Sequence, residues 1–343
     1  KDDLDGKFSL VGDIDFSQVS GWGNVTFEGE LNGNGYAIKN LVINSETNST
    51  MRGLFDNIVS GTVKNLNMEN VSIDSSSQVY IGALSGKNIG ATIENCIVSG
   101  SIKGGNETGG LIGVVCDGKI TSCSSFATVT GNGNYTGGLV GASYGIITSC
   151  LSSGNVTGTG NYTGGLVGQA NSGTITSCSS SGNVTGTSNT GGLVGYNSGT
   201  INKSYSDCKF VKGTNYVGGL VGENRSTLSN SYSLSNVEGS GDYIGGAVGY
   251  NYNSIEKCYS TGEVISTGTG TNVGGFVCDA ARSKSSNSVK DCYTTNGDLP
   301  FYGASRKGGT VDNCYTPSTT EQTGVIHQDA EWFNNGDNLT FLG

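Results

Sequence analysis

A repeat of about 27 residues constrains this chain more than any other feature of its sequence. The segment NYTGGLVGQANSGTITSCSSSGNVTG, residues 161–186, recurs with small changes on both sides. One hydrophobic residue per repeat, placed after a Gly-Gly pair or its counterpart, serves as a marker. The markers are Leu54, Leu84, Leu111, Leu139, Leu166, Leu193, Leu220, Ala247, Phe276 and Tyr302. They stand 26 to 30 residues apart, and a fixed period of this size indicates stacked supersecondary units.

The composition of the repeat favours strands over helices. The chain contains 59 Gly, and glycine costs roughly 1 kcal/mol per helical position relative to alanine. Each repeat holds three short β-favourable runs, as at Gly164–Gly168, Thr174–Cys178 and Asn183–Thr187, separated by turn-forming residues. We therefore predict an all-β fold, a parallel, right-handed, three-sided β-solenoid of about ten 27-residue coils with terminal caps.

Two columns of residues test this prediction, because both should face the interior. One column is small: Cys96, Cys123, Cys150, Cys178, Ser204, Ser231, Cys258, Cys292 and Cys314. The other is aliphatic and stands three residues earlier, as in Ile93, Ile120, Ile147, Ile175, Ile201, Leu228, Ile255, Val289 and Val311. Simple alternation along a strand cannot bury both, since three is odd. We predict a bend between them, at the polar column that holds Ser149, Ser177 and Asn230.

The motif Gly-Gly-Leu-Val-Gly followed by Gly-Thr-Ile-Thr-Ser-Cys resembles the GLUG repeat, which occurs in bacterial surface proteins, including adhesins and immunoglobulin A protease-like proteins. The opening segments 10–16 and 27–43 resemble the region that commonly precedes such repeats. Ala247 and Cys278 depart from the motif. The resemblance implies a surface-exposed solenoid, and it brings no catalytic residue with it.

The repeat pattern divides the chain into three parts. Residues 1–50 are predicted to form an N-terminal cap and the first strands, and residues 51–315 the solenoid repeats. Residues 316–343 are predicted to be a C-terminal cap or docking segment, in which Leu339, Phe341 and Leu342 are candidates for end-to-end contact with another copy.

Charge and hydropathy restrict the partners and the cellular location expected for this chain. The net charge is -10 and only 13% of residues are charged, which argues against nucleic acid as a partner. No apolar stretch approaches the roughly 20 residues of a membrane span, so no membrane insertion is expected in this segment. The chain opens on Lys1, and we interpret it as a processed, exported protein of the extracellular space or cell surface.

The cysteines allow two interpretations. Neighbours one coil apart would have Cα atoms about 4.8 Å apart, within the range of a disulfide. The possible bridges are Cys96 with Cys123, Cys150 with Cys178, and Cys292 with Cys314. The favoured interpretation is a ladder of buried thiols, because Ser204 and Ser231 occupy the same column and stacked side chains point in parallel. With one His and no Cys-x-x-Cys pair, we expect no metal site and no cofactor.

A tyrosine recurs four residues before the marker, at Tyr80, Tyr135, Tyr162, Tyr216 and Tyr243. Asn189 and Asn272 interrupt this series. Stacked aromatic faces beside amides suit sugar rings, so the series is a candidate binding face for a glycan or a protein partner. The favoured structural alternative is an aromatic ladder that packs on itself. A second series, Tyr205, Tyr232, Tyr259, Tyr293 and Tyr315, follows the cysteine column in the later coils.

These observations favour a structural or adhesive rod over an enzyme. The rod would bind a glycan or a protein of a host or neighbouring cell, or its ends would join copies of itself head to tail into a fibre. The alternative is a β-helix that binds or cleaves polysaccharide with paired carboxylates. The acidic residues of the later coils are Asp207, Glu223, Glu238, Asp242, Glu256, Glu263 and Asp279. Among them, Glu238 and Glu263 stand near equivalent positions of neighbouring coils.

Overall fold

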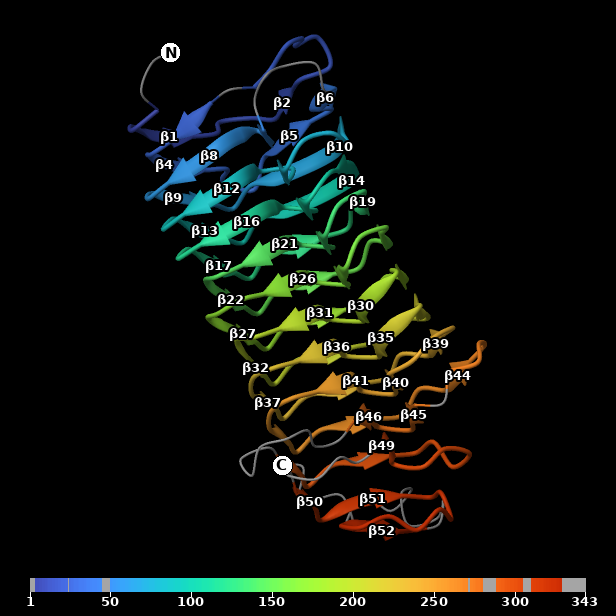
Figure 1. Cartoon of the computed structure of the whole chain (residues 1–343). Coiled ribbons are helices and arrows are strands. Elements are labelled where there is room, and N and C mark those ends of the chain that lie inside the picture. The colour runs from blue at the N-terminus through green and yellow to red at the C-terminus, as the bar shows by residue number, and fades with distance from the viewer. Residues whose placement is uncertain are drawn as a thin grey trace.

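The computed structural model describes residues 4–23, 25–44, 50–270, 272–279, 288–304 and 310–328. These residues contain strands and turns and no helix. Figure 1 shows the coils lying flat on one another as a single shaft, from the blue N-terminal coils to the red C-terminal ones. The predicted all-β parallel solenoid of about ten coils is therefore confirmed.

Four sheets run along the shaft, and every strand pairing within them is parallel. Among the described residues, sheet A has eleven strands, from β3 (Thr26–Phe27) to β49 (Tyr302–Ala304). Sheet B has twelve, from β1 (Lys7–Ser9) to β50 (Thr310–Asp312), and sheet D has nine, from β7 (Met51–Arg52) to β45 (Val273–Gly274).

Sheet C is bent into two rows of strands. The first row runs from β2 (Ile14–Asp15) to β52 (Val325–His327), and the second from β6 (Val42–Asn44) to β44 (Val264–Ser266). The long strand β10 (Asn67–Ser75) belongs to both rows. Its register shifts between Met68 and Val71, which is where the sheet bends.

One coil consequently contains five short strands, where the sequence predicted three longer runs. The coil built from the repeat quoted above comprises β25 (Tyr162–Gly164), β26 (Val167–Ala170), β27 (Thr174–Thr176), β28 (Ser179–Ser180) and β29 (Val184–Thr185). The predicted runs are interrupted because the chain turns a corner within each of them.

The predicted bend between the aliphatic and cysteine columns is confirmed. Ser149, Ser177 and Asn230 have positive φ values of 54°, 53° and 48°. This left-handed conformation rotates the next residue inward, so Ile175 and Cys178 are both buried although they stand three residues apart. Small polar residues suit the corner because they tolerate this conformation better than β-branched ones.

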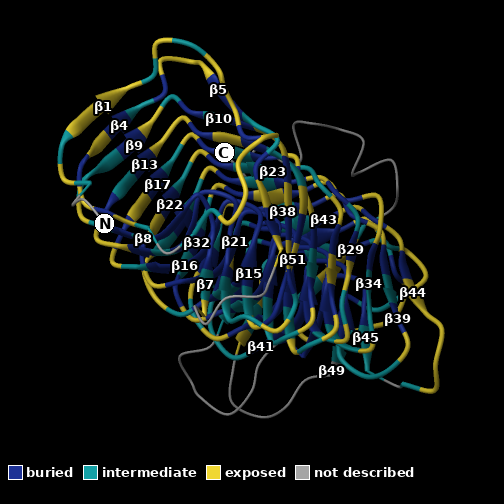
Figure 2. Cartoon of the chain, turned by 90° about the horizontal axis from the view of Figure 1, so that it is seen from above, coloured by how far each residue is buried: buried dark blue, intermediate teal, exposed yellow. Residues whose placement is uncertain are grey.

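The marker column lies on the axis of the shaft, where Leu111, Leu139 and Leu166 are fully buried. Figure 2, which looks from above, shows buried residues along the interior and exposed ones at the outer turns. The tenth marker is Phe301, so the sequence-based choice of Tyr302 was wrong by one residue. Tyr302 pairs with Val277, and the Phe301 ring stacks on the ring of Phe276 at 4.9 Å.

The glycine pair Gly164-Gly165 before the marker Leu166 is required by close packing. A Cβ atom on Gly164 would lie 2.0 Å from the carbonyl oxygen of Val167, and one on Gly165 2.0 Å from that of Gly192. Only glycine allows the chain to turn here without pushing neighbouring coils apart.

Candidate functional site

Two neighbouring columns of side chains form one face of the shaft. The tyrosine column lies on sheet D and contains Tyr80, Glu107, Tyr135, Tyr162, Asn189, Tyr216 and Tyr243 at equivalent positions of successive coils. The flanking column lies on sheet A and contains Lys87, Val114, Ala142, Gln169, Tyr196, Glu223 and Tyr250. Side chains of the two columns contact each other, as Tyr162 does Tyr196 and Tyr216 does Tyr250.

The tyrosines of the column stack on one another where they are adjacent. The rings of Tyr135 and Tyr162 lie 5.5 Å apart between centroids and are parallel within 4°. The rings of Tyr216 and Tyr243 lie 4.9 Å apart and are parallel within 2°. Tyr80, the remaining tyrosine of the predicted series, has no tyrosine in the next coil of its column, because Glu107 takes that position.

The break at Asn189 is filled by its neighbours. The Asn189 amide donates a hydrogen bond to Glu223 Oε2, and Arg225 Nε lies 2.6 Å from Glu223 Oε1. The guanidinium of Arg225 also lies over the Tyr252 ring, 4.4 Å from its centroid. The Tyr196 ring packs edge-on against Tyr162 at 5.2 Å and occupies the space that a stacked tyrosine would take. This break is therefore closed by an interlocked polar and aromatic cluster.

The break at Glu107 is open. Here the flanking column has small side chains, Val114 on β16 (Ile112–Cys116) and Ala142 on β21 (Val140–Ser143), and they leave a hollow of about 340 Å³. Tyr80, Lys87, Glu107 and Tyr135 line it. The strands that carry it, β15 (Glu107–Gly109) and β16, follow each other directly along the chain and belong to sheets D and A. We call this space the Glu107 hollow.

The polar groups of the Glu107 hollow carry opposite charges. Glu107 Oε2 is buried and has no hydrogen-bond partner among the described residues. Burial raises the pKa of the Glu107 carboxyl, and the nearby Lys87 ammonium opposes this shift. Lys87 Nζ lies 3.9 Å from the centroid of the Tyr80 ring, as in a cation–π contact. Burial, and after it the Glu107 charge, raises the pKa of the Tyr135 hydroxyl.

The second tyrosine series forms a separate, uninterrupted stack on sheet C. Successive ring centroids from Tyr205 through Tyr232 and Tyr259 to Tyr293 lie 4.7 to 4.9 Å apart, and the rings are parallel within 10°. No break among these four residues leaves a ring face open. This stack is the self-packing ladder that the structural alternative predicted.

All ten cysteines are free thiols, so none of the three possible bridges is formed. In the ladder, Cys123 Sγ accepts a hydrogen bond from the Cys96 backbone N–H at 3.4 Å and donates one to the Thr121 carbonyl at 3.2 Å. Cys150 and Cys178 repeat this arrangement, and Ser204 Oγ continues it by accepting from the Cys178 N–H at 3.1 Å. The possible bridge between Cys292 and Cys314 is absent as well. The parallel stacking of the side chains opposes bridge geometry, as expected.

Glu238 and Glu263, the carboxylates considered for polysaccharide cleavage, do not stand at equivalent positions of neighbouring coils. Glu238 pairs with Ile265 in the next coil and makes an ion pair with Lys212 at 2.6 Å. Glu263 lies two residues before Ile265, where its backbone N–H bonds to the Asn236 side chain. The coils repeat after 27 residues here, whereas Glu238 and Glu263 are 25 apart, so the two residues differ by two positions in register. Within the described part of the chain, no group of three or more His, Cys, Asp or Glu is placed to hold a metal ion.

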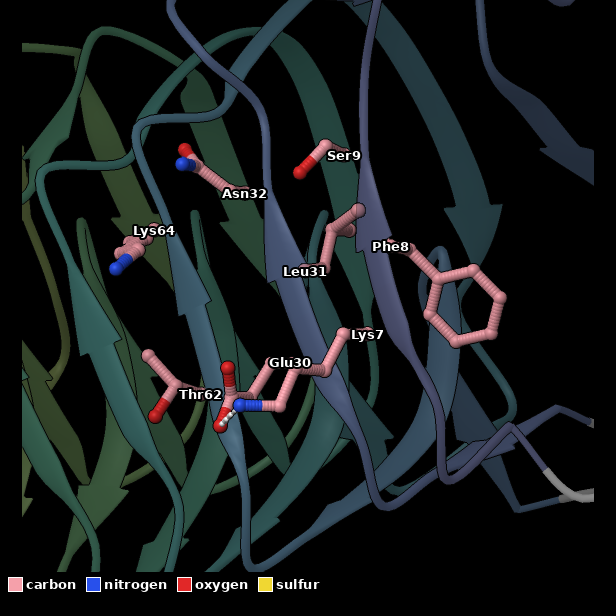
Figure 3. A pocket seen from close by; sticks show the side chains of 8 residues that line it. All are labelled: Lys7, Phe8, Ser9, Glu30, Leu31, Asn32, Thr62 and Lys64. Atoms are coloured by element: carbon pink, nitrogen blue, oxygen red, sulfur yellow. Dashed lines mark ion pairs between the residues drawn. The ribbon is translucent and has the colours of Figure 1, made fainter.

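A second hollow, near the first coils, lies over sheet B. Figure 3 shows Lys7 and Phe8 on the terminal strand β1 beside Glu30 and Leu31 on β4 (Glu30–Asn32), with an ion pair of 3.1 Å between Lys7 and Glu30. At the other end, the predicted docking residues Leu339, Phe341 and Leu342 lie outside the described residues. No helix able to span a bilayer was found in the described ranges.

Sequence reasoning identified the tyrosines of the face and missed the residues that make the hollow. Glu107 stands four residues before the marker Leu111, so the same count that found the tyrosines identifies it as a third break. Lys87 and Val114 have no sequence signal of their own. Their place follows only from the register between sheets A and D.

Two family models match the chain. Residues 1–100 match the N-terminal region of the M26 IgA1-specific metallo-endopeptidases, and residues 159–185 and 240–265 match the GLUG motif. The recognition of GLUG repeats and of the segment before them is thus confirmed. Each model covers only part of the chain.

Two individual proteins are similar to it. Halomucin of Haloquadratum walsbyi (strain DSM 16790 / HBSQ001) is 37% identical over 97 residues, which are 27% of this chain and 1% of halomucin. The chain therefore corresponds to a very small part of that relative. A solved structure of a Bacteroides ovatus protein assigned as an immunoglobulin A1 protease aligns with all of this chain and 83% of that one, at a TM-score of 0.45 and 18% identity.

Proposed function

We propose that this GLUG-repeat β-solenoid is an extracellular, cell-surface rod that binds polysaccharide chains along its tyrosine-lined face. The observation that carries the proposal is the pairing of the tyrosine column with a flanking column of polar and aromatic groups. Sugar rings bind by laying an apolar face on an aromatic ring while their hydroxyls bond to charged or amide groups.

The repeat geometry suits a polymer as the ligand. Equivalent side chains recur every coil, about 4.8 Å apart, so a chain of repeating units meets similar groups along the shaft. Once one sugar unit is bound, the next unit of the same chain is held near its own site at a high effective concentration. The overall affinity for the polymer therefore exceeds that of each weak contact. A face of this kind is expected to bind long chains much more tightly than single sugars.

The composition supports an extracellular location. The chain has few charges, and its repeats match a motif also found in surface proteins, which the partial likeness to halomucin supports. Ten free thiols would be unusual outside the cell, where disulfides normally form. Nine of them are buried in this structure, and burial protects them from oxidants.

A polysaccharide array probed with the purified chain tests the proposal. We expect retention of at least one class of long polysaccharide and no detectable binding of its monosaccharide. The double variant Tyr135→Ser, Tyr243→Ser should lose most of this binding, whereas the matched variant Tyr205→Ser, Tyr232→Ser on sheet C should keep it. Absence of binding to every polysaccharide, or equal loss in both variants, would reject a binding role for this face.

The open edge of the first coil favours a second candidate, self-association into a fibre. Among the described residues, strand β1 pairs on one side only, with β4, and exposed apolar residues lie near it: Phe8 is 41%, Val11 92% and Ile14 40% exposed. Unpaired edges of this kind pair readily with another chain. Light scattering over a concentration series tests this candidate. Growth of the mass with concentration that Phe8→Lys abolishes supports it, and a constant monomer mass rejects it.

A further inference from the structure

We propose that the Glu107 hollow is a subsite for one neutral pyranose ring. The ring stacks on Tyr135, and its hydroxyls donate hydrogen bonds to the Glu107 carboxylate. This inference rests on the proposed polysaccharide-binding function and assigns its most selective position. It is the only open break in the tyrosine column among the seven coils from Tyr80 to Tyr243.

The aromatic surface for the sugar is the second face of Tyr135. Tyr162 covers the first face by parallel stacking at 5.5 Å. The opposite face borders the hollow, because the next residue of the column is Glu107 and not a tyrosine. Tyr80 stands two coils from Tyr135, about 10 Å away, and the Lys87 ammonium covers its ring, so Tyr135 provides the stacking surface.

The polar groups select for hydroxyls. Glu107 Oε2 is a buried acceptor that lacks a donor among the described residues, and an unpaired buried carboxylate oxygen is costly. A vicinal diol supplies two donors to one carboxylate. An aromatic side chain of a protein partner would stack equally well on Tyr135 and would leave this oxygen unpaired, so a sugar fits the hollow better.

The charges select for a neutral ring. Lys87 and Glu107 are the two residues that carry charge among those lining the hollow, and they are of opposite sign. Lys87 already covers the Tyr80 ring, so a second cation would be repelled from that side. An anionic sugar would be repelled by Glu107. A neutral ring satisfies both, since hydroxyls donate to carboxylate and accept from ammonium.

The hollow exists because the flanking column is small at this height. Val114 and Ala142 occupy the positions in the flanking column that Tyr196 and Glu223 occupy at the closed break. Each of the four follows the tyrosine-column residue of its own coil by the same number of positions. The substitution Val114→Tyr should therefore fill the hollow with a ring, as Tyr196 does near Asn189, without disturbing the core.

Calorimetric titration with neutral hexasaccharides of glucose, mannose and N-acetylglucosamine, and with hexagalacturonate as the anionic counterpart, tests the proposal. We expect one neutral oligosaccharide to bind and the anionic one not to. Glu107→Gln should weaken binding about tenfold, as expected for loss of a hydrogen bond to a charged group, and Val114→Tyr should abolish it. Glu263→Gln is the matched control, because its carboxylate is exposed far from the face, and it should bind as the unmodified chain does.

The outcomes separate the two proposals. If the unmodified chain binds and Tyr243→Ser weakens it while Glu107→Gln and Val114→Tyr do not, the face binds glycans and the hollow is not the subsite. If no oligosaccharide or polysaccharide binds, the function itself is rejected. Preferred binding of hexagalacturonate also overturns the neutral-sugar assignment. Circular dichroism and the unfolding midpoint of each variant establish that lost binding is not lost folding.

Discussion

The tyrosine column is broken at Asn189 and at Glu107, and the two breaks have opposite outcomes. At Asn189 the neighbouring Glu223 is 7% exposed and holds both the asparagine amide and Arg225. At Glu107 the carboxylate belongs to the column itself, and its flanking neighbours are too small to reach it. The same repeat therefore yields a closed structural cluster in one coil and an open polar hollow three coils earlier.

The comparison shows that a missing ring in an aromatic ladder is not itself a site. Whether space remains depends on the side chain one sheet away, because the two columns interdigitate along the face. The backbone differs too. Asn189, Tyr216 and Tyr243 have positive φ values of 47°, 54° and 66°, which is uncommon for tyrosine, whereas Tyr135 and Tyr162 do not.

The largest effect is expected from breaking the closed cluster. Glu223→Ala leaves the Asn189 amide and the Arg225 guanidinium without their acceptor, and should lower the free energy of unfolding by about 2–4 kcal/mol. Urea unfolding followed by circular dichroism measures this. Glu223→Gln, which keeps one acceptor oxygen, should cost less than half as much. Equal stability of Glu223→Ala and the unmodified chain would show that the cluster does not hold this part of the face together.

Opening the closed break should have an intermediate effect. Tyr196→Ala removes the ring that packs edge-on against Tyr162 and should cost about 1–2 kcal/mol, which combines the aromatic contact with lost apolar burial. The converse change, Val114→Tyr, should cost nothing or stabilise slightly. If both substitutions destabilise equally in urea unfolding, the open hollow is not simply an unfilled version of the closed break.

A smaller, pH-dependent effect is expected at Glu107. Burial raises the pKa of its carboxyl in the folded chain, so folding favours the neutral form. This contribution is fully present below the ordinary glutamate value of about 4.3 and is lost as the pH rises through the folded value. Glu107→Gln should therefore melt slightly above the unmodified chain at pH 7 and together with it near pH 3. A lower melting temperature for Glu107→Gln at pH 7 would contradict this assignment.

The smallest effect concerns Cys116, which lies on the rim of the Glu107 hollow. It is the one cysteine of ten that is not fully buried, and burial still raises the pKa of its thiol. N-ethylmaleimide at pH 8 should modify about one thiol per native chain and all ten in denaturant. A bound oligosaccharide should slow this reaction a few-fold. Modification at several sites of the native chain would contradict the buried thiol ladder.

Much of the fold was predictable because the period of the sequence repeat indicates stacked β-coils directly. The bend at Ser149 and Ser177 followed from one numerical fact, the odd spacing of two columns that must both face inward. The thiol state of the cysteines followed from Ser204 in the same column. The division of most coils into five strands was not predictable, because left-handed corner residues interrupt runs that read as continuous strands.

The site was predictable only in part. The count from the marker identified the tyrosines, and applied once more it identifies Glu107. It says nothing of Lys87 or Val114, which reach the hollow from another sheet. Their position depends on how sheets A and D meet at the glycine pair, a property of three-dimensional packing. For Glu238 and Glu263, the count along the repeat gave near-equivalent positions, and the register shows that they differ by two residues.

The most direct test follows individual tyrosine rings during titration. With ¹³C-labelled tyrosine, resonances assigned by single substitutions, and the neutral hexasaccharide that binds in calorimetry, Tyr135 and Tyr80 should shift most, and Tyr205 and Tyr232 of the continuous stack should not move. Shifts confined to the continuous stack, or an unshifted Tyr135 at saturation, would contradict the claim that the open break in the column is where this surface receives its ligand.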